Sequence, residues 1–106
     1  MTSKPFTLED LETQVARTQG RGDWSRRYPY RLVVAIEEEA SEARDAAASF
    51  LLGGCSDEQR EALKLELGDV LNVVTAIAMH AGFTLREVAE ANDAKMRARM
   101  PEGCGQ

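Results

Sequence analysis

The sequence has little of several residue types that particular classes of protein require. Its 13 lysines and arginines are outnumbered by 18 aspartates and glutamates, which gives a net charge of −5. A protein whose main partner is a nucleic-acid backbone or an anionic membrane needs a basic face. The composition therefore argues against both partners. It still allows a small phosphate ligand, because a bound cation can reverse the local field.

Cysteine is also scarce, and long apolar runs are missing. Cys55 and Cys104 lie in glycine-containing contexts ("GGCSD" and "EGCGQ") without a CxxC partner, which disfavours zinc sites and disulfide frameworks. No run approaches the roughly 20 apolar residues of a membrane span, and the start "MTSKPFTLEDLE" has no apolar signal-peptide core. We therefore expect a soluble, cytoplasmic protein.

The alternation of apolar and polar residues that is typical of strands is missing too, and apolar residues recur at helical spacing along the chain. The length of 106 residues fits a single domain, and the end signals predict an all-α, four-helix bundle-like protomer. Short connections between the last three helices predict that they pack antiparallel. The predicted helices cover about 8–18, 29–52, 57–81 and 85–100, with caps at Thr7, Ser56 and Thr84, an N-terminal helix and loop at 7–28, and a flexible tail at 101–106.

Carboxylates are concentrated in the stretch "LVVAIEEEASEARDAA" at 32–47. Because a helix turns about 100° per residue, Glu39 falls at the edge of its helix's apolar arc, and Glu42 follows one turn later among small residues. Glu66 points into the apolar arc of the next helix, and Asp69 lies at the edge of that arc. Each of two adjacent helices thus carries an acid pair at spacing i, i+3 near its apolar side.

A carboxylate that points into a core costs several kcal/mol unless it is paired or coordinates a metal. Four carboxylates from facing helices form an all-oxygen site, which suits Mg²⁺ or Mn²⁺ better than zinc. Di-iron bundles need Glu-x-x-His pairs, and the single histidine, His80, lies about 16 Å along the axis from Asp69. The alternative is a solvated acidic face, with Glu66 paired to Arg44 or Lys95. The two paired spacings favour the metal site.

The acid motifs resemble those of a known superfamily. "EEASE" at 38–42 matches EExxE, and "ELGD" at 66–69 matches ExxD, with 23 residues between them. In this order and helical context they resemble the MazG-like all-α nucleotide pyrophosphohydrolases, which include dimeric dUTPases, dCTP pyrophosphatases and phosphoribosyl-ATP pyrophosphohydrolase. The resemblance covers about residues 28–100 and continues through "VLNVVTAIAMHAGFTLREVAEANDAKMRAR".

The resemblance implies a Mg²⁺ site, with Mn²⁺ as a substitute, formed by Glu39, Glu42, Glu66 and Asp69, with Glu38 as a supporting acid. The implied reaction is cleavage of a (d)NTP between its α- and β-phosphates, giving (d)NMP and pyrophosphate. In it, Glu38 or Glu39 accepts a proton from the attacking water. Relatives complete their active sites across subunits, which implies a homodimer or homotetramer.

Five residues are candidates for contact with the nucleotide. The family's Asn-x-x-Lys implies ligand roles for Asn92 and Lys95, with a helix-packing hydrogen bond as the alternative for Asn92. Trp24 either stacks on a base or covers the end of the bundle. Asn72 and Arg99 are weaker candidates, and Arg99 fits a solvated helix end equally well.

Two other functions are compatible with the same residues. A phosphoribosyl-ATP pyrophosphohydrolase-like enzyme would differ only in its substrate. A non-catalytic helical module would instead bind a partner through its acidic face. Hydrolysis with a divalent metal separates the enzymes from the binding module.

Overall fold

The computed structural model describes residues 4–20 and 27–100, and every regular element in these ranges is helical. This confirms the all-α prediction. α1 (Leu8–Val15) continues into a short π-helical turn, η1 (Ala16–Gly20), and α2 (Arg27–Ala48) continues into a second, η2 (Ser49–Gly53). α3 (Asp57–Ala81) and α4 (Leu85–Arg99) complete the chain. No helix in the described ranges is long and apolar enough to cross a membrane.

Three helices begin at the predicted caps. The hydroxyls of Thr7, Ser56 and Thr84 each accept a hydrogen bond from the backbone N–H three residues later, at 3.0–3.1 Å. The side chain at that later position accepts a bond from the N–H of the cap in return. These reciprocal bonds satisfy backbone donors that the start of a helix otherwise leaves open.

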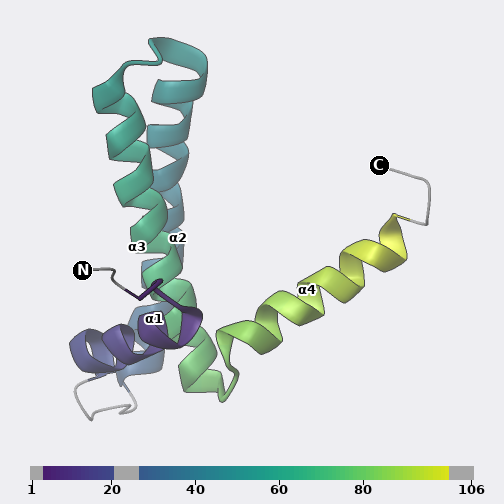
Figure 1. Ribbon diagram of the computed structural model, residues 1–106. Coiled ribbons are helices and arrows are strands. Elements are labelled where there is room, and N and C mark those ends of the chain that lie inside the picture. The colour runs from purple at the N-terminus through teal and green to yellow at the C-terminus, as the bar shows by residue number, and fades with distance from the viewer. Residues whose placement is uncertain (1–3, 21–26, 101–106) are drawn as a thin grey trace.

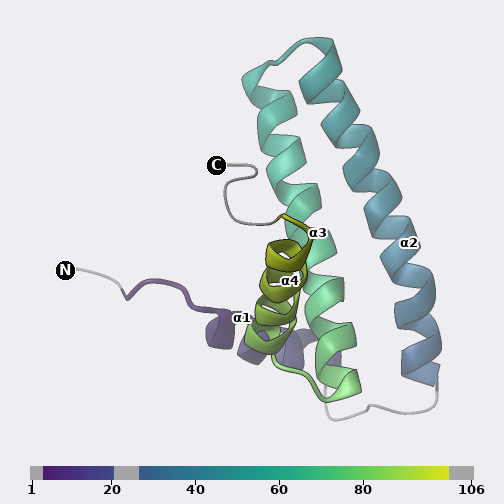
Figure 2. The same ribbon diagram turned by 90° about the vertical axis from the view of Figure 1, so that its right-hand side faces the viewer.

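α2 and α3 lie side by side and antiparallel, forming a long hairpin (Figure 1, Figure 2). This arrangement confirms the prediction from their short connection. At the tip of the hairpin, the Gln59 amide donates to the backbone oxygen and the hydroxyl of Ser49, at 2.9 and 2.8 Å. These bonds tie the start of η2 to the first turn of α3, so the hairpin is fixed at the end remote from the core.

The core lies at the opposite end of the hairpin, where α1 lies across its base (Figure 1). Among the described residues Val15 of α1 and Thr75 of α3 are completely buried, and the Thr75 hydroxyl donates to the Leu71 carbonyl oxygen at 2.7 Å. The buried cluster draws on all four α-helices and consists of Leu11, Val15, Leu32, Val73, Ala76, Ala78 and Leu85.

α4 leaves the base of the hairpin and projects away from it (Figure 1), so the predicted antiparallel packing of the last two helices is wrong. The chain turns at Gly82, whose φ of 89° lies in the left-handed region that glycine adopts at little cost. Leu85 is the only buried residue of α4. The later apolar positions of the helix, such as Val88, stay exposed, because nothing in the described part of the chain covers them.

Candidate metal centre

Three glutamates meet across the hairpin. Glu39 and Glu42 come from α2 and Glu66 from α3, and one carboxylate oxygen of each lies within 4.8 Å of the other two. Glu39 and Glu66 are half-buried, whereas Glu42 is exposed. Because α2 and α3 run antiparallel, the acid motifs of the two helices fall at the same height along the hairpin. The structure therefore brings together three of the four predicted metal ligands.

The pKa values of two carboxylates in this triad, those of Glu39 and Glu66, are raised. Burial, followed by the charges of Glu42 and Asp69, raises the pKa of Glu66 above its ordinary value of 4.5. Burial also raises the pKa of Glu39, with further contributions from Glu42, Asp69 and Glu66. Glu66 Oε1 is buried and has no hydrogen-bond partner among the described residues. A buried oxygen that receives no donor is costly unless a ligand supplies the missing positive charge.

No protein cation supplies that charge within the described part of the chain. Arg44, one candidate partner of Glu66, instead donates to Asp45 at 3.0 Å. Lys95, the other, lies on the projecting helix α4. None of the ion pairs among the described residues includes a member of the triad. The alternative in which Glu66 is satisfied by Arg44 or Lys95 is therefore not realised in this chain.

The triad fits a hard divalent cation. Its donors are all carboxylate oxygens, the ligands that Mg²⁺, Mn²⁺ and Ca²⁺ prefer. The buried Oε1 of Glu66 has no hydrogen-bond partner among the described residues, and one oxygen of the same carboxylate lies within 4.8 Å of oxygens of Glu39 and Glu42. A cation here would offset both the burial and the neighbouring negative charges that raise the pKa values of Glu39 and Glu66.

Two further predicted acids lie beside the triad. Asp69 is exposed and falls outside the group of oxygens within 4.8 Å, although its charge contributes to the raised pKa of Glu39 and of Glu66. Glu38 is exposed as well. Together with Glu42 it lines an open hollow of about 530 Å³ on the outer side of α2. Glu42 thus belongs to the triad and also lines the open hollow.

The predicted nucleotide contacts are dispersed. Asn92, Lys95 and Arg99 are exposed on α4, which points away from the hairpin (Figure 1), so they do not reach the triad of the same chain. Asn72 is half-buried on α3, one turn beyond Asp69. Trp24 lies outside the described residues. The ligand roles of all five stay predictions.

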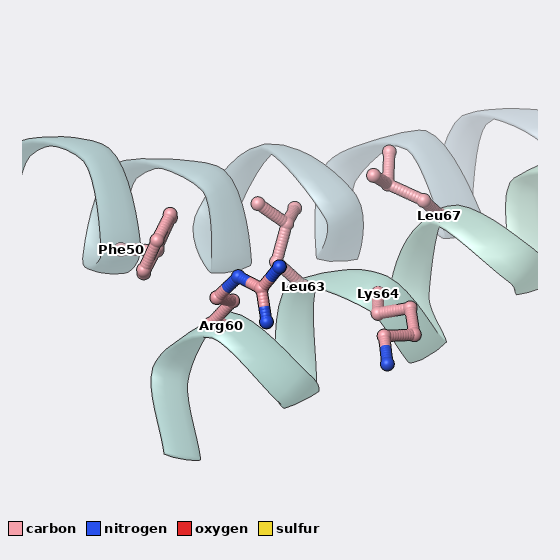
Figure 3. Close-up of a pocket in the computed structure, with 5 residues that line it drawn as sticks. All are labelled: Phe50, Arg60, Leu63, Lys64 and Leu67. Carbon is pink, nitrogen blue, oxygen red and sulfur yellow. The ribbon is translucent and has the colours of Figure 1, made fainter. Parts of the chain in front are cut away.

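The sequence reasoning did not single out a groove at the tip of the hairpin. Phe50, Leu63 and Leu67 form its apolar floor, and the side chains of Arg60 and Lys64 line its edge (Figure 3). The groove has a volume of about 250 Å³. Lys64 is already paired with Glu61 at 3.1 Å. The i, i+4 spacing of both the cations and the leucines is visible in the sequence, but it is common on helices and is not specific for a site.

Comparison with known proteins adds one positive finding. The family model of the MazG nucleotide pyrophosphohydrolase domain matches residues 28–104, a range that includes both acid motifs and α4 and leaves α1 outside. No curated protein matches the chain.

Proposed function

Since the chain belongs to the MazG nucleotide pyrophosphohydrolase family, we propose that it cleaves nucleoside triphosphates between the α- and β-phosphates, with Mg²⁺ held by its acid triad. Family membership by itself gives nucleotide pyrophosphohydrolase activity in general. The proposal adds the triphosphate substrate, the products (d)NMP and pyrophosphate, and the metal. The observation that carries it is the convergence of the Glu39, Glu42 and Glu66 carboxylates across the hairpin, together with the buried Oε1 of Glu66, which has no hydrogen-bond partner among the described residues.

The acids have two roles in the proposed reaction, which are to hold the metal ion and to accept a proton from water. Mg²⁺, when bound, supplies positive charge to the phosphates and lowers the pKa of the attacking water. Glu39, Glu42 and Glu66 hold the ion, and Asp69 of α3, whose charge acts on Glu39 and Glu66, is the fourth ligand. Glu38, which shares the open hollow with Glu42, accepts the proton of the water as general base, and Glu39 is the second candidate for that role. The hollow receives the phosphate chain.

A second copy of the chain completes this site in our proposal. Asn92 and Lys95 are exposed on an arm that points away from the acids of their own chain, so a partner's acids are the ones they can reach. The hairpin also leaves large apolar side chains exposed, among them Val33 (69 %), Leu67 (52 %) and Leu71 (47 %). Several large apolar side chains exposed on one hairpin are typical of an interaction surface. We therefore propose a homodimer or homotetramer with shared sites.

A product analysis tests the activity. The protein is incubated with a panel of NTPs, dNTPs and phosphoribosyl-ATP, each with Mg²⁺ or Mn²⁺, and the products are separated by ion exchange. We expect monophosphate and pyrophosphate, without diphosphate and free phosphate.

Glu66→Gln should lower the rate of hydrolysis more than about 100-fold, because loss of even an outer partner of a metal ligand typically lowers metal affinity or activity 10–100-fold. The matched variant Glu58→Gln, at an exposed position of the same helix, should keep the rate. No hydrolysis of any nucleotide would contradict the proposal and favour a binding module.

A further inference from the structure

The first turn of α4 is held by two acids of α1. The Glu12 carboxylate accepts a hydrogen bond from the backbone N–H of Leu85 at 2.7 Å. One residue further on, the Arg86 guanidinium donates to the Glu9 carboxylate at 3.2 Å. These two bonds join residues that are 73 and 77 positions apart in the sequence, and they connect α1 directly to the start of α4.

The bond to Glu12 satisfies a donor that α4 does not cap by itself. The capping box of α4 uses the N–H groups of Thr84 and Glu87, which leaves the N–H of Leu85 between them. A carboxylate on this N–H forms a charge-assisted bond and lies at the positive end of the helix dipole. Glu12 therefore fixes the position of the first turn of α4 more firmly than a neutral contact would.

The side chain of Leu85 adds a packing contact at the same place. It is 6 % exposed and belongs to the buried cluster with Leu11 and Val15 of α1. Beyond this first turn every residue of α4 is exposed except Met96, which is half-buried. Within the described part of the chain, the direction of the whole helix is thus set at its start.

A helix held at one end converts a small rotation into a large displacement. With a rise of 1.5 Å per residue, Lys95 lies about 15 Å from Leu85 along the axis, so a rotation of about 10° at the start moves Lys95 by about 2.6 Å. Ligand-binding groups must be placed far more accurately than this to act on a substrate. The start of α4 therefore controls the position of Asn92 and Lys95.

We propose that α1 is a brace that sets the direction of α4, and that Glu12 is a positioning residue for the nucleotide contacts carried by that helix. α1 lies outside the residues that the family model matches, so the family match assigns it no role. The orientation of α4 by α1 stands on the contacts alone. Its consequence for the nucleotide rests on the proposed function.

A distance measurement tests the brace without reference to activity. Spin labels are placed on the exposed Cys55 at the hairpin tip and on Ala94→Cys of α4, in a Cys104→Ser background diluted with unlabelled protein. We expect a narrow distribution of distances that broadens in Glu12→Ala. Glu12→Gln, which keeps an acceptor oxygen, should restore a narrow distribution. Gln14→Ala, at an exposed position of the same helix, should leave it unchanged. An unchanged distribution in Glu12→Ala would overturn the proposal.

Kinetics separates a positioning role from loss of the fold. If Glu12 acts through α4, Glu12→Ala should raise KM for the nucleotide several-fold while the divalent-ion affinity of the triad stays at the wild-type value. A rise in KM accompanied by a loss of divalent-ion affinity would indicate general unfolding and would overturn the positioning role. Arg86→Ala removes only the exposed bond to Glu9 and should change distances and KM in the same direction but less. If the wild-type protein hydrolyses no nucleotide, the proposed function fails, and the distance measurement still decides the brace.

Discussion

Glu66 has an environment unlike that of an ordinary surface glutamate. Its Oε1 is buried without a donor among the described residues, and the charges that act on it are those of two other carboxylates, Glu42 and Asp69. On a helix with good propensity for glutamate, this position costs stability when no cation is bound. Such a cost is expected where a side chain is kept for a ligand rather than for the fold.

The raised pKa of Glu66 gives a prediction about stability and pH. Because the folded pKa lies above the ordinary value of 4.5, the folded state favours the protonated form, and stability is lost as the pH rises through the folded pKa. In metal-free protein we expect Glu66→Gln to be more stable than the wild type at about pH 7, and the difference to shrink as the pH falls towards about 5. Denaturant unfolding of both proteins in the presence of a chelator, at several pH values, measures the difference in the free energy of unfolding and its change with pH. A wild type that is the more stable of the two at neutral pH would contradict the prediction.

The sequence predicted the contacts of the triad but not the role of Glu12. Glu39, Glu42 and Glu66 lie on short-range helical patterns, so counting 100° per residue places them on facing sides of two neighbouring helices. Asp69 lies outside the triad, and the count did not predict this, because it places Glu39 at the edge of its arc as well. Glu12 bonds to a residue 73 positions away. No periodicity or local motif carries that information.

At the scale of elements, capping residues explain where helices begin but do not explain the direction of α4. Thr7, Ser56 and Thr84 cap their helices as expected, because a capping box needs only residues within one turn. The direction of α4 depends on the turn at Gly82 and on contacts between its first residues and α1. A short connection allows antiparallel packing but does not enforce it, and within the described part of the chain the apolar stripe of α4 buries only Leu85.

At the scale of the whole molecule, the separation of the acids from Lys95 predicts shared active sites. Glu66→Gln and Lys95→Ala should each lower activity strongly as single variants. When the two variants are co-expressed and pair at random, about half of the dimers are mixed. Each mixed dimer has two shared sites, and one of them contains both Glu66 and Lys95 intact. About a quarter of wild-type activity should therefore return. Activity assays on the co-expressed pair, with each variant alone as control, measure this. If Lys95 served the acids of its own chain, mixing would restore nothing.

The proposed metal site is tested by a calorimetric titration with Mg²⁺ or Mn²⁺. Wild-type protein and Glu42→Gln are compared, with Glu58→Gln as a control at an exposed site of α3. If the triad binds the divalent ion, the wild type and Glu58→Gln should bind it and gain thermal stability from it, whereas Glu42→Gln should lose both the binding and the gain in stability. Equal binding by the wild type and Glu42→Gln would show that the triad is not the metal site.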